Sequence, residues 1–422
     1  MVDVAPVRLD PEYRRLWASS LVGTLGRQMV LVALPFELWQ LTHSSLSIGL
    51  LAIVQLVPIL TFALGGGAVA DAVDRRRLLT VTTILLASTS VVLVLLAAQP
   101  SPPVWAFYVV AFVAAAVGAV DGPTRSSTTP RLVPRERLTA AITMSSLSMN
   151  GMSVAGPALA GAMIQLWGVP SAFGLDVLMG LLGLAAILSL APIPPHPDAA
   201  RPGITAVREG LSFMRASGII MSSFVIDLDA MIFGMPSSLF PQLALTVFNV
   251  GAAGYGLLTA APAFGAVLGA AMTGWAGRVR RPGRGVVVAV AAWGVAIVAF
   301  GLSTWSLPVA LAFLALAGAA DVVSAVLRSM IIQFETPDRL RGRLMSIHTL
   351  VVTSGPRLGD AEAAAVAAVA GAQFSVVSGG ILCLVGLLAV VRRFPQLLSY
   401  ELAHATTPPR GSASDPIDTR VA

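Results

Sequence analysis

The stretch GAVADAVDRRR, from Gly67 to Arg77, decides how this chain is organised. It follows an apolar run of about twenty residues, which is long enough to cross a bilayer whose hydrocarbon core is ~30 Å thick. Two acids and three consecutive arginines then appear within seven positions, Asp71 to Arg77. Because ionised side chains are costly inside a bilayer, the cluster marks a point where the chain leaves the membrane.

Composition places the whole chain in a membrane. The 422 residues are 56% hydrophobic and 11% charged, with a mean hydropathy of +0.83. A soluble protein of this length needs far more polar surface. The net charge of +6 does not indicate a nucleic-acid partner, because the basic residues lie between apolar runs. The single cysteine, Cys383, excludes an internal disulfide and a cysteine-based metal site.

The apolar runs predict an all-α polytopic membrane protein with twelve transmembrane helices. Helices follow because backbone polar groups in lipid must be satisfied within the protein. The predicted spans are 15–40, 46–70, 78–98, 103–122, 139–166, 171–191, 217–245, 252–275, 285–303, 307–329, 343–370 and 373–392.

The arginines are divided unevenly between the two sides of these spans. The turns 41–46 and 99–103 contain none, and the loops on the opposite side contain nearly all of them. Arginine-rich loops stay in the cytoplasm. We therefore expect a multi-pass protein of the cell membrane with both termini cytoplasmic.

Short repeats divide the chain into two halves. GAVD at 118–121 recurs as GAAD at 318–321, and Gly156-Pro157 recurs as Gly355-Pro356. The two offsets, 200 and 199 residues, are nearly equal. Matches in the same order at one offset predict two pseudo-symmetric six-helix halves, at 1–191 and 217–394.

The connector and the tail have other compositions. The proline-rich PIPPHPDAARPG at 192–203 leads into ITAVREGLSFMRAS at 204–217, whose apolar residues share one helical face. The segment 192–216 is therefore a cytoplasmic linker whose amphipathic helix either lies in the membrane interface or connects the halves. The tail, 395–422, is expected to be disordered.

Several motifs resemble those of the major facilitator superfamily. GGGAVADAVDRRRLL at 65–79 resembles its signature between the second and third spans, and AGPALAG at 155–161 resembles the fifth-span motif of its antiporters. VALPFELWQLTHSSLSIGLL, DLDAMIFGMPSSLFPQLA and TPDRLRGRLMS are similar to the branch that contains the enterobactin exporter and drug-efflux proteins. The resemblance covers residues 12–393 and implies two halves around a central cavity.

The loop motif implies a gate on the cytoplasmic side. By resemblance, Gly67 allows a close helix approach and Asp71 latches the closed gate, beside a positively charged helix N-terminus. The superfamily has arginine directly after this aspartate, whereas this chain has Ala72. Asp74 or the arginines Arg75, Arg76 and Arg77 are candidates to substitute, and the arginines also serve as topology signals.

The Gly-Pro pairs predict two matched kinks, because proline removes a helical hydrogen bond. By resemblance, Gly156, Pro157 and Gly161 in the fifth span seal the cavity and favour exchange over leak. A plain packing kink is the alternative. Gly355 and Pro356 form the corresponding pair in the eleventh span.

Ionisable residues within the spans are candidates for the transport site, because a charge in the bilayer costs at least ~2.5–3.5 kcal/mol and normally faces protein or a wet cavity. By resemblance, spans one, four, seven and ten line the cavity, and each carries a charge. The candidates are Arg27, Glu37, Asp121, Asp227, Asp229 and Asp321.

Among these, Asp227 is our candidate for the group that titrates, with Arg27 as its counter-charge. A static bridge of Arg27 to Asp227 or to Glu37 is the alternative. In the eleventh span, Arg357 and Asp360 are three residues apart and are expected to pair.

These features predict a proton-coupled exporter of small amphipathic compounds, drug-like or siderophore-like. No Gly-Lys phosphate loop, metal-spaced cluster or nucleophile constellation is present, so we expect no enzyme activity and no cofactor besides the coupling proton. The expected partners are a small-molecule substrate and lipid, and by resemblance the chain is a monomer. The alternatives are an uptake permease for nutrients and a membrane scaffold or sensor without transport.

Overall fold

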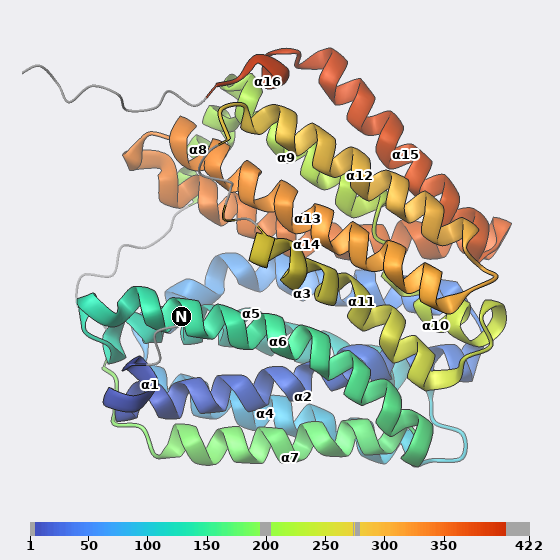
Figure 1. The fold of residues 1–422 in the computed structure, drawn as a ribbon. Helices are drawn as coiled ribbons and strands as arrows, with labels where there is room; N and C mark the ends of the chain where they lie inside the picture. Colours follow the sequence, from blue (N-terminus) through green and yellow to red (C-terminus); the bar gives the residue numbers. More distant parts are fainter. Residues whose placement is uncertain (1–4, 195–203, 273, 275–278, 402–422) are drawn as a thin grey trace, which may run out of the picture.

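The computed structural model describes residues 5–194, 204–272, 274 and 279–401, without the side chains of 63–72, 204–208, 210 and 339. Long helices lie roughly side by side (Figure 1). After the short α1 (Ala5–Leu9), the first half contains α2 (Pro11–Thr42), α3 (Ser45–Ala72), α4 (Arg75–Ala97), α5 (Val104–Leu132), α6 (Arg135–Trp167) and α7 (Val169–Leu188).

The second half follows the connecting helix α8 (Ile204–Ala216). It contains α9 (Gly218–Phe233), which continues through Ser237–Leu239, α10 (Phe240–Gln242) and Leu243–Val247 as one interrupted span. The remaining helices are α11 (Gly251–Met272), α12 (Pro282–Leu302), α13 (Leu307–Glu335), α14 (Asp338–Ala370), α15 (Ala372–Arg393) and α16 (Gln396–Ser399).

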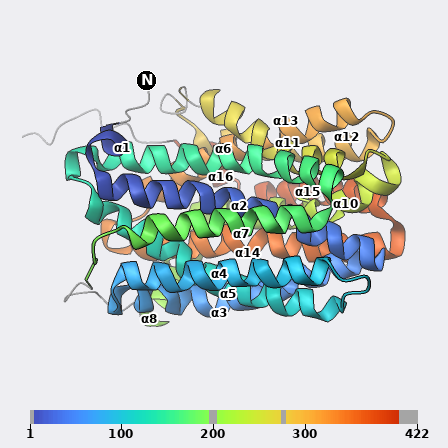
Figure 2. The same cartoon turned by 90° about the horizontal axis from the view of Figure 1, so that it is seen from below.

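The predicted twelve-helix arrangement is confirmed. Ten of the described helices are long and apolar enough to cross a membrane, and α6 and α14 are not among them. Both run along the boundary between the halves, α6 against α11 and α14 against α3 (Figures 1 and 2). The Gly-Pro pairs lie in these same two boundary helices.

Two predicted helix ends are wrong. The fourth span was expected to end at 122 and the tenth at 329, but α5 continues to Leu132 and α13 to Glu335. The extra turns of α5 are polar, and the hydroxyls of Thr124 and Thr128 donate to backbone carbonyls of their own helix. Hydropathy alone cannot find such turns, because they are helical without being apolar.

The two halves touch at one end of the molecule, which we call the arginine-poor end because the turns 43–44, 98–103 and 303–306 form it. A Cβ atom placed on Gly161 of α6 would lie 2.7 Å from the Cα atom of Gly256 in α11. A Cβ atom on Gly49 of α3 would lie 2.6 Å from the Cβ atom of Ala364 in α14. Glycine is therefore required at both helix crossings.

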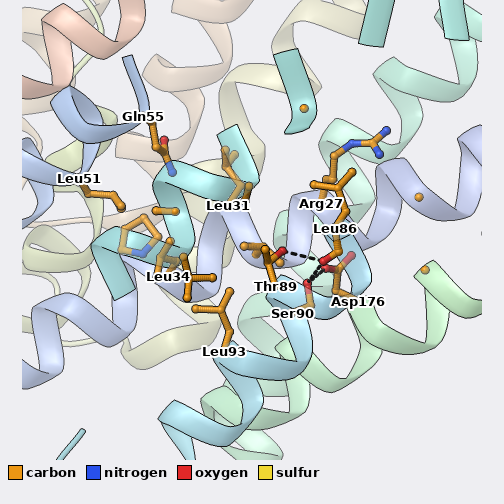
Figure 3. A pocket seen from close by; sticks show the side chains of 18 of the residues that line it. Arg27, Leu31, Leu34, Leu51, Gln55, Leu86, Thr89, Ser90, Leu93 and Asp176 are labelled. Carbon is orange, nitrogen blue, oxygen red and sulfur yellow. Dashed lines mark hydrogen bonds between the residues drawn. The ribbon is translucent and has the colours of Figure 1, made fainter. Parts of the chain in front are cut away.

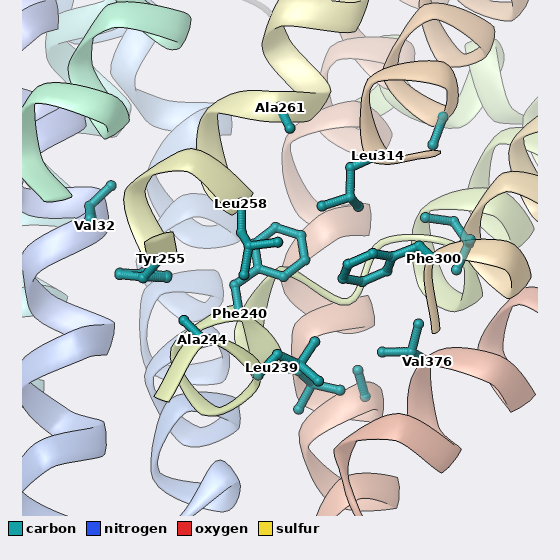
Figure 4. Close-up of a cluster of buried hydrophobic side chains, with 14 of the residues drawn as sticks. Val32, Leu239, Phe240, Ala244, Tyr255, Leu258, Ala261, Phe300, Leu314 and Val376 are labelled. Atoms are coloured by element: carbon teal, nitrogen blue, oxygen red, sulfur yellow. The ribbon is translucent and has the colours of Figure 1, made fainter. Parts of the chain in front are cut away.

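Polar and aromatic contacts reinforce this closed end. Ser45 donates to Oε1 of Gln242 at 2.6 Å, and the backbone N–H of Ala252 donates to Oε1 of Gln165 at 3.0 Å. The rings of Phe36 and Tyr255 stack with their centroids 5.6 Å apart. Side chains from both halves join one buried cluster there (Figure 4).

The opposite, arginine-rich end is formed by the turns 73–74, 133–134 and 336–337 and by α1, α8 and α16 (Figure 1). Among the described side chains, no ion pair or hydrogen bond joins α2–α7 to α9–α15 at this end. Along α6, a Cβ atom on Gly151 would meet nothing within 4 Å, whereas one on Gly161 would collide with α11. The halves therefore separate toward the arginine-rich end.

The three arginines that follow α3 bind within the first half. Arg75 is buried and donates to the carbonyl of Ser127 at 2.5 Å, and Arg76 donates to the carbonyl of Leu188 at 2.5 Å. Asp74 caps α4 by accepting from the backbone N–H of Arg77 at 2.9 Å. The arginines Arg75 and Arg76 thus tie α4 to the ends of α5 and α7, where unpaired carbonyls attract cations.

The connector contains the expected helix, whereas the tail is more ordered than expected over its described part. Met214 and Leu211 of α8 pack into a cluster with α9, α13 and α14, which fits the connector interpretation. The prediction of disorder from 395 onward is wrong for 396–401, because Leu397 is fully buried and Glu401 forms an ion pair with Arg281 at 2.5 Å. Residues 402–422 lie outside the described part.

The glycine crossing yields a prediction. Gly161→Ala is expected to disfavour the state closed at the arginine-poor end, because its methyl group would overlap Gly256. Spin labels at the exposed positions Leu46 and Thr246, in a Cys383→Ser background, report the separation of the halves at this end. The long-distance population should rise in Gly161→Ala.

Gly151→Ala is the matched control, since the same methyl group would enter open space on the same helix. Equal distance distributions for Gly161→Ala and Gly151→Ala would contradict the role assigned to the crossing.

Candidate functional site

A cavity of about 290 Å³, which we call the first chamber, extends from the middle of the first half to the boundary. Leu31, Leu34, Leu51 and Leu93 provide its apolar wall, and Arg27 and Asp176 provide charge (Figure 3). Gln55, Thr89 and Ser90 add polar groups. Apolar walls with a few polar groups are typical of sites for small organic molecules.

A second chamber of about 340 Å³ lies mainly in the second half. Its wall includes Asp321, Trp293 and Phe240. The two chambers share five residues, which are Leu31, Ser237, Thr259, Arg357 and Asp360. The shared residues make the chambers two parts of one central cavity between the halves.

In the first half, a charged network surrounds Asp121. Arg125 donates its Nε to Asp121 at 2.7 Å, and Thr82 donates to the other carboxylate oxygen at 2.8 Å. Arg125 also donates to Ser19, Ser20 and Thr83. An Arg27 Nη atom is 4.0 Å from Asp121, and 43% of the Arg27 side chain is exposed. Asp121 is thus neutralised by Arg125, and Arg27 remains open to the cavity.

In the second half, Asp227 and Arg328 form a buried ion pair. Nη2 of Arg328 lies 2.7 Å from Oδ1 of Asp227, and the side chains are 2% and 1% exposed respectively. The same nitrogen lies 4.0 Å from Asp321, whose side chain is 33% exposed and lines the second chamber. Arg328 therefore links a buried acid to an acid that faces the cavity.

The expected pairing of Arg27 with Asp227 is wrong, because each charge finds its partner within its own half. Arg125 lies three residues beyond the expected end of the fourth span, and Arg328 lies at the last position but one of the expected tenth span, so neither was a candidate for the transport site. They lie within α5 and α13, four and seven residues after Asp121 and Asp321. The spacing of four and seven residues from Asp121 and Asp321 places both arginines on the same helix face as the acid, and this was the sequence signal that could have identified them as partners.

Because the two halves are pseudo-symmetric, residues at matching positions can be compared directly. Arg27 and Asp227 lie 200 residues apart at matching positions of α2 and α9, as Asp121 and Asp321 do in α5 and α13. The first half presents its arginine to the cavity, whereas the second half buries its aspartate against Arg328. The first half thus presents to the cavity a cation that lies 4.0 Å from its nearest ion-pair partner, Asp121, and the second half presents an acid, Asp321.

Asp360 of α14 stabilises the backbone at the point where the seventh span is interrupted. The span breaks at Gly234–Pro236, and Asp360 accepts from the hydroxyl of Ser237 at 2.6 Å and the backbone N–H of Ser238 at 2.8 Å. Free backbone donors at a helix start need such an acceptor. Among the described side chains, the expected pair of Arg357 with Asp360 is an electrostatic interaction without an ion-pair contact within 4.0 Å, and Nε of Arg357 has no hydrogen-bond partner.

Two of the predicted acids lie away from the chambers. Asp229 packs against α15, where a Cβ atom on Gly386 would lie 1.9 Å from its Oδ1. Glu37 is 8% exposed and lies in the part of α2 that leads to the arginine-poor end. Neither lines a chamber, so the structure separates them from Asp321 and Arg27.

The Gly-Pro motifs contribute to the contacts of the boundary helices. Gly156 leaves room for Gln28 of α2, and the carbonyl of Pro157 lies against Gly256 of α11. In α14, Gly355 packs against Met231 of α9, and Pro356 lines the second chamber. The gate residues Gly67 and Asp71 lie outside the described side chains, so their roles stay predictions.

A helical bundle of two matched halves that contact at one end and enclose a partly charged cavity defines a multi-pass membrane transporter. Over residues 2–416 the chain matches the family described as transmembrane secretion effector. The chain therefore belongs to this family of major facilitator superfamily transporters.

Characterised relatives and solved structures agree with this assignment. The chain is 27% identical to the enterobactin exporter EntS of Citrobacter koseri over 94% of this chain and 96% of that one. It is 26% identical to EntS of Shigella boydii over 98% of both chains. The fold is similar to a bacterial homologue of the human lysosomal transporter Spinster, described as inward-facing and unoccupied, with a TM-score of 0.72, 17% identity and coverage of 95% and 100%.

A POT family transporter in complex with 5-aminolevulinic acid has a TM-score of 0.73 at 12% identity, covering 91% of this chain and 96% of that one. At these identities, the two structures show that the fold is shared.

The buried pair yields a prediction for stability. Asp227→Asn or Arg328→Gln alone should lower the midpoint of thermal unfolding in detergent, because breaking a buried ion pair costs about 3–5 kcal/mol. The double variant Asp227→Asn/Arg328→Gln should recover part of the loss, since two neutral amides replace the pair. Asp338→Asn, which breaks an exposed pair with Arg341, is the control and should leave the midpoint unchanged. Strictly additive losses at Asp227 and Arg328 would contradict the pairing.

Proposed function

We propose that this protein is a proton-coupled exporter that exchanges small amphipathic compounds for protons by alternating access. The observation that carries the proposal is the Asp227–Arg328–Asp321 group in the second half. It places a buried ion pair 4.0 Å from an acid on the cavity wall. Charged groups are kept inside a membrane domain at a cost of several kcal/mol, and they mark ion pathways.

Asp321 is the proposed entry point for the proton. When its carboxyl group is ionised, Arg328 is attracted by two acids, and when it is protonated, Arg328 is held by Asp227 alone. The position of α13 relative to α9 then depends on whether the proton is bound. A proton thereby changes the contacts of the helices that line the cavity, which is what coupling to alternating access requires.

Export requires a state of the transporter that is open to the cytoplasm. The arginine-rich end is assigned to the cytoplasm because arginine-rich loops stay inside. The cavity separates toward that end, so the described state accepts its compound from the cytoplasm. Relatives named enterobactin exporters support export, and they support the cytoplasmic membrane as the location.

The driving force is sufficient for export. One proton moving inward supplies ~2.3 kcal/mol per 100 mV of membrane potential. A pH difference adds ~1.4 kcal/mol for each unit. One proton for each exported compound is therefore enough to maintain a gradient of several hundredfold at ~100 mV and one pH unit.

The test is substrate-induced proton release from inverted membrane vesicles. Respiration acidifies their interior, and a quenched pH dye reports the gradient. Addition of enterobactin, ethidium or 1-pyrenebutyrate to vesicles with the wild-type protein should restore fluorescence for at least one compound. Asp321→Asn and Asp227→Asn should abolish the response, because each removes a carboxylate from the group that carries the proton.

Asp229→Asn is the matched control, since it removes the same charge from the same helix on the side that faces α15. It should respond like the wild type. Full release by Asp227→Asn and Asp321→Asn, or accumulation of a compound without proton release by the wild type, would overturn the proposed coupling.

A further inference from the structure

The central cavity contains two arginines whose hydrogen-bonding capacity is largely unused. Arg27 of α2 and Arg357 of α14 both line the first chamber, so each half of the transporter contributes one guanidinium group. Within the described part of the chain, Arg27 donates only to Thr24, at 3.1 Å, and its ion-pair distance to Asp121 is 4.0 Å. Nε of Arg357 is buried and has no hydrogen-bond partner among the described residues.

The acids of the cavity are engaged elsewhere. Asp121 is held by Arg125, Asp176 accepts from Ser90, and Asp360 accepts from Ser237 and Ser238. Asp321 lies 4.0 Å from Arg328. A buried guanidinium N–H without an acceptor, such as Nε of Arg357, is costly, and an anion that accepts its hydrogen bond removes this cost.

We infer that the transported compound carries an anionic group, such as a carboxylate, sulfonate or catecholate, that binds between Arg27 and Arg357. Leu31, Leu34 and Leu93 surround the rest of the first chamber and fit an apolar or aromatic body (Figure 3). The substrate class is therefore the amphipathic anion. This inference rests on the proposed export function and specifies what the same cavity binds.

The placement of the two arginines also connects binding to movement. Arg27 belongs to the first half and Arg357 to the second, and the halves are separated at the arginine-rich end. An anion that contacts both arginines favours the arrangement in which they are close together. A ligand can shift a conformational equilibrium only by binding one state better than another, and a bridging anion does so.

The two chambers also separate the proposed substrate-binding residues from the proposed proton-binding residue. Arg27 faces the first chamber, Asp321 faces the second, and Arg357 belongs to both. An anion at Arg357 therefore lies in the same continuous cavity as Asp321, where its negative charge opposes the ionised form of that carboxyl group. Proton and substrate occupy neighbouring parts of one space without sharing a residue.

The test uses equilibrium binding to the purified full-length protein in detergent, without any gradient. The probes are 1-pyrenebutyrate and 1-pyrenebutanol, which share an apolar body and differ in the charged group. The wild type should bind the acid at least about tenfold more tightly than the alcohol, as expected for charge-assisted hydrogen bonds. Arg27→Gln and Arg357→Gln should each reduce this preference severalfold, and the double variant should remove it.

Two control sets separate recognition from folding and net charge. Arg27→Lys and Arg357→Lys keep the charge and should keep most of the preference. Arg341→Gln removes an exposed arginine outside the cavity and should leave the preference unchanged. The alcohol should bind all folded variants with similar affinity.

Equal affinities for acid and alcohol, no saturable binding of the acid, or an undiminished preference in the double variant would overturn the inference. Because no proton gradient is involved, these outcomes do not depend on coupling. Proton-coupled export of a neutral compound would leave the proposed function intact and remove only the anion site. Binding of the anion without proton release would do the reverse.

Discussion

The constraint on which this structure depends is that a polar group inside a bilayer must find its partner within the protein. It explains why the spans are helices, and it also governs the one span that is interrupted. Where the seventh span breaks at Gly234–Pro236, Trp293 donates to the carbonyl of Gly234 and Asp360 accepts from Ser237 and Ser238. The break is possible because two neighbouring helices supply the missing hydrogen bonds.

The same constraint divides the charges between the halves. Asp121 and Asp227 are almost fully buried, and each has an arginine of its own half as partner. Arg27 and Asp321 are partly exposed to the cavity. The pseudo-symmetric positions 27 and 227 thus carry opposite charges in different environments. In the proposed transport cycle, the proton binds in the second half, whereas the substrate contacts an arginine from each half.

Movement between the halves is limited by helix crossings at the arginine-poor end. Backbones approach closely at Gly161 with Gly256 and at Gly49 with Ala364, and van der Waals packing is the main attraction between helices in a bilayer. Contacts of this type involve no strong charge, so they can separate and reform. At the other end, Arg75 and Arg76 strengthen the first bundle internally, which favours motion of that half as a rigid body.

The sequence by itself determined the class of fold, because hydropathy, arginine placement and the 200-residue repeat are properties of the chain read in order. It also named six ionisable residues as candidates, since any charge within an apolar span is costly, and two of them, Arg27 and Asp321, line the chambers. It did not determine their partners. Arg125 and Arg328 fell beyond or near the expected ends of their spans, because hydropathy cannot distinguish a polar helical turn from a loop. Only the tertiary structure decided which acid each arginine neutralises, that Asp360 holds the broken seventh span, and that Arg27 and Arg357 remain open to the cavity. These outcomes depend on which helix faces are brought together, and that is set by packing between segments far apart in the chain.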